Sequence, residues 1–301
     1  MIKSITVTNY LGQSKKFELS RPDKSGFAIT NIEGLGPSKS NILTTEVATN
    51  DGAIFNSARS EVRNIVITFD FRFAKDVEEA RHESYKYFPN KKKLKLVIET
   101  DKRTCETYGY VEDNDPSIFS QYETTQISII CTDPYLYSLE KNITVFSGVE
   151  SIFEFPFSNE SLSGNLLEIS ALRVDTHQTV YYEGDSEIGI LISIHAIGEA
   201  KNVTIYNTGT REVMKLDSAK IEALTGSGIV AGDEIEISTV KGNKYIKLIR
   251  DGLETNILNC LDKKTSWFQI SKGDNIFAYT ADEGEANLQF RIENKIVYEG
   301  V

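Results

Sequence analysis

The sequence predicts a mainly β protein of two domains: an N-terminal β-sandwich-like domain with one α-helix, and a C-terminal jelly-roll β-sandwich. The 301 residues suffice for two domains of ordinary size. Apolar and polar residues alternate in many short runs, as in half-buried strands. In the second half, turn-forming sequences recur about every ten residues, a spacing typical of sandwiches. We expect the boundary near residue 140, with domains 1–140 and 141–301.

Strands dominate the first half of the chain. In Arg63–Phe73 every second residue is apolar, which predicts a long strand with one buried face and one mostly polar face. The residues of the buried face are Ile65, Ile67, Phe69, Phe71 and Phe73. Similar alternation predicts further strands over Lys3–Asn9, Phe27–Ile32, Leu94–Thr100, Cys105–Glu112 and Gln126–Thr132.

One helix is expected in this half, directly after Asp76. The Asp76 carboxylate can cap the first turn, and Glu79 follows three residues later, as in a capping box. Pro89 ends the helix. One face of this helix would carry Val77, Ala80, Ser84, Tyr87 and Phe88.

The second half is predicted to be all β. Its clearest turn is Asp251-Gly252, which lies between Lys247–Arg250 and Leu253–Asn256. Asp-Gly at this place is typical of a two-residue hairpin, since both central residues of a type I′ turn need a positive φ. Gly226-Ser227-Gly228 is interpreted as another turn, because it lacks the strand-to-helix context of a hydrolase nucleophile.

The net charge is −11 and is unevenly distributed. Residues 1–140 carry 18 basic and 20 acidic side chains, whereas residues 141–301 carry 15 and 24. This balance argues against a nucleic-acid-binding protein, which would present a basic face. No apolar run is long enough to span a bilayer, so we expect no membrane insertion, and an alternating N-terminus favours maturation in the cytoplasm.

A search for catalytic chemistry finds no convincing site. His82, His177 and His195 have no acidic or cysteine partner at metal-ligand spacing. Three widely spaced cysteines suggest neither a disulfide framework nor a zinc site. Asp113-Asn114-Asp115 begins like a calcium loop, but the later ligand positions are wrong, so a turn before Pro116 is favoured. We therefore expect no catalytic residue, no metal and no cofactor, and a protein that is not an enzyme.

Two groups of residues are candidates for binding. Lys91, Lys92, Lys93 and Lys95 form the one basic cluster, which is either a solvated strand edge or a contact with another subunit. Trp267, with Tyr245 and Tyr279 in neighbouring strands, is either a platform for stacking sugars or part of the core.

Several segments, in this order and spacing, resemble the family of distal tail proteins of long-tailed phages that infect Gram-positive bacteria. One of them, Asn50–Arg59, contains the pattern D-G-x-x-F-x-x-x-R, with Phe55 and Arg59 as its last two fixed positions. The second half resembles the galectin-like sandwich often appended in this family. The other segments are Ile29–Pro37, Arg63–Thr68, Tyr85–Lys92, Tyr108–Glu112 and Asp133–Tyr137.

The resemblance implies a structural protein of the virion tail tip, assembled in the cytoplasm of the host bacterium. Six N-terminal domains would close into a baseplate hub ring. This homo-hexamer would join the tail tube and tape-measure proteins to a tail-associated adhesion or receptor-binding protein. DNA would pass through the lumen without specific binding, helped by the total charge of six acidic copies.

The segment Pro37–Ala58 is long for a structureless connection. We predict that it takes part in contacts between subunits as a β-hairpin, with Phe55 and Arg59 as candidate contact residues together with the lysine cluster. An alternative function is a carbohydrate-binding module in residues 141–301 that attaches the particle to cell-wall glycans. A glycosidase is a third hypothesis. Its two catalytic carboxylates would come together only in the folded chain, so the sequence alone does not exclude such a pair.

Overall fold

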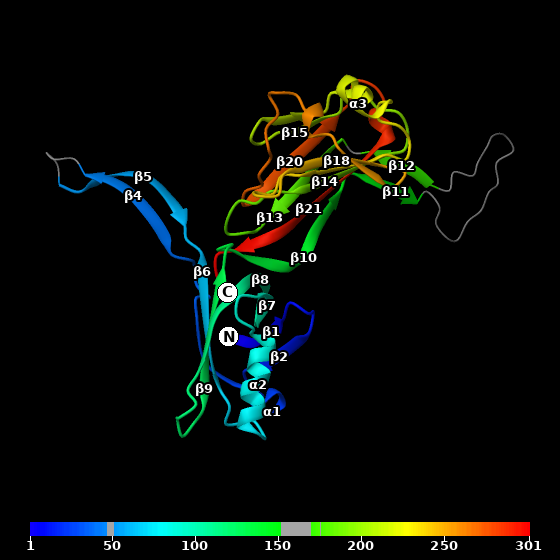
Figure 1. Cartoon of the computed structure of the whole chain (residues 1–301). Coiled ribbons are helices and arrows are strands. Elements are labelled where there is room, and N and C mark those ends of the chain that lie inside the picture. Colours follow the sequence, from blue (N-terminus) through cyan, green and yellow to red (C-terminus); the bar gives the residue numbers. More distant parts are fainter. Residues whose placement is uncertain (47–50, 152–169, 175) are drawn as a thin grey trace. The chain divides into compact units, whose positions relative to one another are not determined.

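The computed structural model describes residues 1–46, 51–151, 170–174 and 176–301 (Figure 1). The chain divides into two compact units: unit 1 comprises Met1–Glu140 and Val297–Val301, and unit 2 comprises Lys141–Ile296. The expected C-terminal domain continued to residue 301. The last five residues instead pack in unit 1, where the Val301 N–H donates to the Leu35 carbonyl over 3.1 Å.

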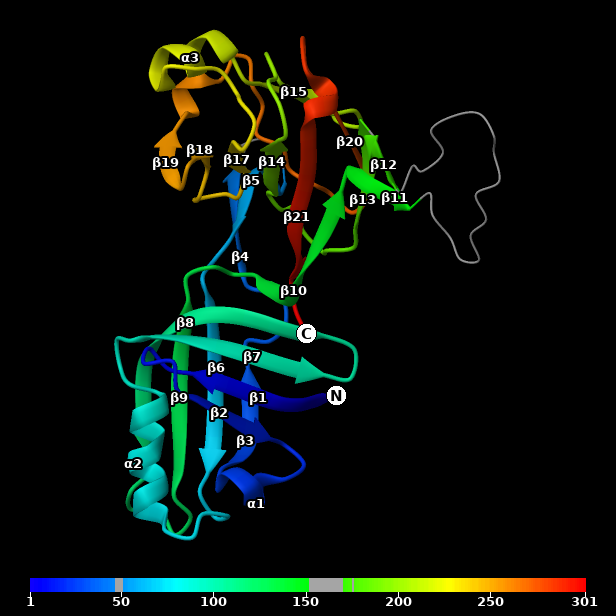
Figure 2. The ribbon, with the colours of Figure 1, turned by 90° about the vertical axis from the view of Figure 1, so that its right-hand side faces the viewer.

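Unit 1 consists of two antiparallel layers that share one long strand. Strand β8 pairs with β7 through its first half and with β9 through its second half. The first layer has the order β2–β1–β7–β8, and the second has β3–β6–β9 (Figure 2). The elements are β1 (Ile2–Thr8), β2 (Ser14–Glu18), α1 (Pro22–Ser25), β3 (Ala28–Glu33), β4 (Ser40–Glu46), β5 (Ala53–Ser60), β6 (Arg63–Asp70), α2 (Val77–Tyr87), β7 (Lys93–Thr100), β8 (Thr104–Pro116), β9 (Thr124–Cys131) and β10 (Leu136–Val145).

The core of unit 1 lies between these layers and is rich in phenylalanine. The alternation predicted for β6 is confirmed, since Ile65, Ile67, Phe69 and Phe71 are fully buried. Phe69 contacts the rings of Phe17, Phe27 and Phe88, with centroids 4.9–5.6 Å apart.

The prediction for Phe73 was wrong, because β6 ends at Asp70. The Asp70 carboxylate accepts hydrogen bonds from the Arg72 main chain and side chain. This turn directs the chain away from the core, and Phe73 is 50% exposed.

Helix α2 begins and ends close to the predicted places. The Asp76 carboxylate accepts hydrogen bonds from the N–H groups of Glu78 and Glu79, so the predicted cap is confirmed. The buried residues of the helix are Ala80 and Ser84. Strand β2 was not predicted, although its Phe17 lies at the centre of the core.

The predicted hairpin within Pro37–Ala58 is present as β4 and β5, while its residues 47–50 lie outside the described part of the chain. The two strands pair from Ser40 opposite Ser60 to Glu46 opposite Ala53, with one bulge. Figure 1 shows this hairpin projecting beyond the other strands of unit 1.

Unit 2 is a sandwich of two antiparallel sheets, with the orders β19–β18–β17–β14–β21 and β13–β20–β15–β16. Strands β11 and β12 form a separate antiparallel pair, which runs from Ser147 opposite Val174 to Ser151 opposite Ser170. The elements are β11 (Ser147–Ser151), β12 (Ser170–Val174), β13 (His177–Tyr182), β14 (Leu191–Ala196), β15 (Thr204–Asn207), β16 (Glu212–Lys215), α3 (Ser218–Thr225), β17 (Glu234–Ser238), β18 (Tyr245–Arg250), β19 (Leu253–Asn256), the 3-10 turn Leu258–Cys260, β20 (Gly273–Thr280), the 3-10 turn Glu285–Asn287 and β21 (Leu288–Tyr298).

The two sheets of unit 2 enclose one apolar core. Tyr279 of one sheet stacks on Phe290 of the other, with ring centroids 3.8 Å apart. The predicted Asp251-Gly252 turn joins β18 to β19 with φ values of 51° and 78°, as a type I′ turn requires. The mainly β class is therefore confirmed, while the galectin-like topology of unit 2 stays a prediction.

Two local predictions were wrong. The second half is not all β, because Ser218–Thr225 forms helix α3, capped by the Asp217 carboxylate, and Gly226 ends this helix rather than a simple turn. Asp113-Asn114-Asp115 is not a turn either. It continues β8, where Asn114 and Asp115 pair with Ile127 and Gln126 of β9.

Candidate functional site

The β4–β5 hairpin is the most unusual surface of unit 1. Every described residue of it is exposed except the partly buried Asn41, and Phe55 is 63% exposed. The register places Ile42 and Phe55 on one face, opposite Ala58 and Thr44 respectively. It places Leu43 and Ile54 on the other face, opposite Ser57 and Thr45. Large apolar side chains therefore meet solvent on both faces, which is typical of a surface that another molecule covers.

The base of the hairpin is closely fixed to unit 1. The Glu61 N–H donates to the Lys39 carbonyl over 2.8 Å and closes the ribbon. Before it, Gly34 adopts a φ of +81°, and a Cβ there would lie 1.9 Å from the Asn64 carbonyl oxygen. Only glycine fits at this position, because any larger residue would collide with the main chain of β6. The glycine therefore lets the segment before the hairpin lie directly against β6.

Arg63 lies directly after the hairpin and is almost completely buried. Its guanidinium donates to the carbonyls of Gly34 and Gly36 over 2.6 Å each, of Pro134 over 2.8 Å and of Glu299 over 2.7 Å. Burial lowers the pKa of the Arg63 guanidinium, which nevertheless stays charged at neutral pH. The sequence pattern placed Arg63 at a strand start and gave no signal of this role.

The lysine cluster lies at the turn between α2 and β7 and along β7. Lys91 has a φ of 64° in that turn. The Lys95 ammonium is 2.6 Å from the buried Glu106 carboxylate, which raises the pKa of Lys95 mainly through this hydrogen bond. Lys95 is thus tied to its own strand pair, whereas Lys92 and Lys93 are exposed.

Exposed tyrosines lie beside these lysines. The Lys92 ammonium is 5.4 Å from the centroid of the Tyr10 ring, and that of Lys93 is 4.8 Å from the Tyr108 ring. We name Tyr10, Lys92, Lys93 and Tyr108 the lysine–tyrosine patch. Its tyrosines were not predicted, because they come from separate segments of the sequence and meet the lysines only in the fold.

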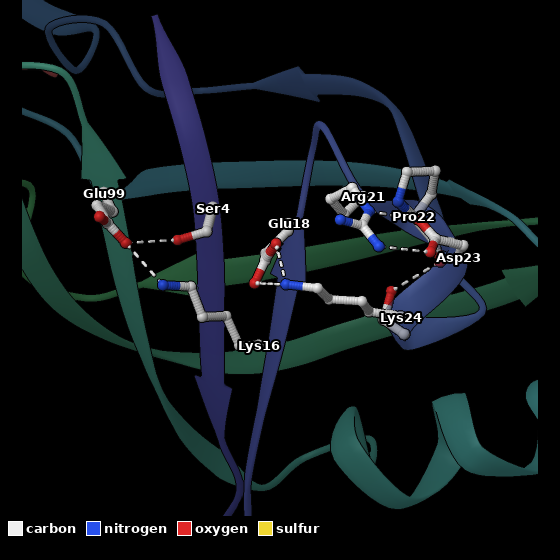
Figure 3. Close-up of polar contacts among 9 residues, drawn as sticks. Ser4, Lys16, Glu18, Arg21, Pro22, Asp23, Lys24 and Glu99 are labelled. Atoms are coloured by element: carbon white, nitrogen blue, oxygen red, sulfur yellow. Dashed lines mark hydrogen bonds and ion pairs between the residues drawn. The ribbon is translucent and has the colours of Figure 1, made fainter.

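The outer face of β1, β2 and β7 is polar and internally paired (Figure 3). The Glu99 carboxylate accepts hydrogen bonds from Ser4 and Lys16 over 2.9 Å each, and the pKa of Glu99 is lowered, first by Lys16 and then by Ser4. Lys24 reaches the Glu18 carboxylate at 3.0 Å. These pairs support the edge strand β2, and such charged side chains disfavour strand addition there.

Of the three residues considered for a sugar platform, Tyr279 is buried, while Trp267 and Tyr245 are partly buried. Tyr279 is fully buried, and its hydroxyl donates to the Leu288 carbonyl over 3.3 Å, so it cannot face a ligand. Trp267 is partly buried against the core, with the Lys244 ammonium 5.2 Å from its ring centroid. The partly buried Tyr245 donates its hydroxyl hydrogen to Glu236 over 3.3 Å. The tryptophan therefore belongs chiefly to the core.

Of the groups that commonly carry catalysis, the cysteines are buried and the histidines are scattered. Cys105, Cys131 and Cys260 are buried thiols, and burial raises the pKa of the Cys131 and Cys260 thiols. A raised pKa disfavours the thiolate that a nucleophile needs. The histidines are exposed on three different elements, α2, β13 and β14; His177 was expected on a loop.

Two further searches cover residues 1–46, 51–151, 170–174 and 176–301. No three histidine, cysteine, aspartate or glutamate side chains of this part are grouped so that they could hold a metal ion. None of its helices has both the length and the apolar character to cross a bilayer.

The fold and the projecting hairpin define a class of two-unit, mainly β protein. Among solved structures, the chain is similar to the Dit protein of phage SPP1, described as a paradigm of the hub adsorption apparatus in phages that infect Gram-positive bacteria. The TM-score is 0.63 at 10% sequence identity, over 97% of this chain and 99% of that chain. The protein therefore has the fold of this hub protein along nearly its whole length.

Weaker likenesses are found to the phage P2 baseplate in its activated conformation. For the structure of that baseplate with Ca, the TM-score is 0.48 at 12% sequence identity, over 98% of both chains. For the structure of the baseplate with Sr, the TM-score is 0.46 at 11% sequence identity, over 97% of both chains. These two likenesses are too weak to establish a shared fold. No protein-family model matches the sequence, and no curated protein matches it.

Proposed function

We propose that this protein is a structural hub of a phage tail tip, which acts by assembly rather than by catalysis. Six copies of unit 1 form a ring that continues the tail tube. The ring connects the tube and tape-measure proteins to the adhesion or receptor-binding protein of the virion. The observation that carries the proposal is the apolar β4–β5 hairpin, exposed on both faces, on a chain with the fold of a hub protein.

The hairpin supplies one half of the interface. A ring requires two different patches, one on each side of every copy, because a self-complementary patch would stop at a dimer. A two-stranded ribbon has little stability in water by itself. Docking on a neighbour buries Phe55 and Ile54, which stabilises both the ribbon and the ring.

The lysine–tyrosine patch supplies the other half. Its exposed lysines and tyrosines can accept an acidic and apolar segment through ion pairs and ring contacts. Near its outer end the hairpin carries the exposed carboxylates of Glu46 and Asp51 beside the apolar Ile54 and Phe55. Arg59 lies nearer the base, where it can contact the neighbour's acidic groups. DNA passes through the ring without specific binding.

The test is the mass and shape of the assembled protein. Six copies of 33.7 kDa give roughly 200 kDa by light scattering, and electron micrographs should show rings with a central hole. Phe55→Asp should reduce the mass to that of one copy, because it places a charge in an apolar contact.

Leu253→Asp is the matched control, since Leu253 is 71% exposed in unit 2 and outside the proposed interface. It should leave the ring intact. A wild-type protein that stays a single copy at assembly concentrations would contradict the hub. If that single copy bound cell-wall glycans on an array, the carbohydrate-binding alternative would replace it.

A further inference from the structure

The guanidinium of Arg63 brings together three distant segments of unit 1. Gly34 and Gly36 lie in the loop that leads into β4. Pro134 precedes β10, along which the chain leaves unit 1, and Glu299 follows β21, along which it returns. All four hydrogen bonds described for this side chain go to main-chain carbonyls.

We propose that Arg63 is a positioning residue: a latch that fixes the base of the hairpin to both chain segments that connect unit 1 to unit 2. A displacement of either connecting segment then disturbs the hydrogen bonds by which Arg63 holds the loop that leads into the hairpin. The hairpin's part in subunit contact rests on the proposed function, whereas the latch itself is a property of the single chain.

The chemistry of arginine explains why this residue type is needed. A guanidinium has five N–H donors in a rigid planar fork, and Arg63 uses four of them in different directions. Lysine has three donors at one point and cannot reach the same four carbonyls. A buried charge held by carbonyl dipoles is costly to disturb, so the four contacts favour one arrangement of the three segments.

Neighbouring contacts support the same latch. The Val301 N–H donates to the Leu35 carbonyl, directly between the two glycines that Arg63 holds. Arg103 donates to the Gly300 carbonyl over 3.4 Å. The C-terminal segment is therefore tied to the hairpin loop through Val301 and to the turn between β7 and β8 through Arg103, so loosening of the hairpin loop is expected to loosen the Val301 contact.

Amide hydrogen exchange of Arg63→Lys tests the latch. The amides of Val301 and Glu61 should both exchange at least about tenfold faster than in the wild type, because their acceptors belong to the released loop and hairpin base. The Phe88 amide at the end of α2, bonded to Ser84, should not change. Arg21→Lys is the matched control, since Arg21 is exposed and pairs with Asp23, and it should leave all three amides unchanged.

A second measurement needs no variant and remains decisive if Arg63→Lys fails to fold. In wild-type protein at low urea concentrations, the Val301 and Glu61 amides should open in one step with the same free energy and the same urea dependence. Different opening energies, or an Arg63→Lys protein in which only one of the two amides accelerates, would overturn the latch. If the protein forms no ring but the Val301 and Glu61 amides open together, the proposed function is overturned and the latch is supported.

Discussion

At the scale of single residues, the phenylalanine cluster determines the stability of unit 1. Phe69 is completely buried and contacts three other rings. Phe69→Ala leaves a cavity among these rings and should cost about 3–5 kcal/mol of unfolding free energy. Urea denaturation followed by tyrosine fluorescence measures the change.

Phe73→Ala provides the control on the same segment. Phe73 is half exposed beyond the end of β6, so its removal should change the unfolding free energy by less than about 0.5 kcal/mol. Equal losses for the two variants would mean that Phe73 also packs in the core.

Alternation in the sequence predicts which apolar side chains of a strand are buried, and it does so correctly for Ile65, Ile67, Phe69 and Phe71. It cannot predict where the strand stops, because the end at Asp70 depends on the hydrogen bonds that this carboxylate makes to Arg72. Arg63 was out of reach for a related reason. Its carbonyl partners lie 27 to 236 residues away along the chain, and a main-chain carbonyl leaves no mark in the sequence.

At the scale of elements, the Asp76 cap fixes the start of α2. The carboxylate satisfies the N–H groups of Glu78 and Glu79, which have no partner within the helix. Asp76→Ala should cost about 1 kcal/mol of unfolding free energy, while Asp76→Asn should cost much less because asparagine also caps. Urea denaturation of both variants distinguishes capping from charge, since equal losses would indicate charge alone.

The hairpin should behave differently in a single copy and in an assembly. The described residues of its two strands are almost all exposed, so the amides of β4 and β5 beyond the base should exchange within about tenfold of the free-chain rate in a single copy. In the proposed ring they should be protected to an extent similar to those of β6. Strong protection in a demonstrated single copy would contradict a partner-dependent hairpin.

Sequence patterns predicted the hairpin from its unusual length, and the Asp251-Gly252 turn from its residue types. They missed α3, which has only eight residues and a single buried apolar side chain, Ile221, so no apolar stripe could form. They also mistook Asp113–Asp115 for a turn, because polar residues in a strand with one solvated face resemble a loop. The lysine–tyrosine patch needed the fold, which brings β7 and β8 together.

At the scale of the whole molecule, two separate cores imply two unfolding transitions. The core of unit 1 contains Phe69 and that of unit 2 contains Phe277. Phe69→Ala should lower the midpoint of one transition in a urea titration, and Phe277→Ala that of the other. A single transition shifted equally by both variants would show that the two units unfold together.

The return of Val297–Val301 to unit 1 also orders events on the ribosome. Glu299 emerges 236 residues after Arg63, when the whole of unit 2 has already been synthesised. Synthesis of unit 1 thus begins before that of unit 2 and is completed after it. In a nascent chain cut short anywhere within unit 2, Arg63 has three of its four carbonyl acceptors, so it can join the hairpin loop to the segment before β10 but not to the C-terminal segment.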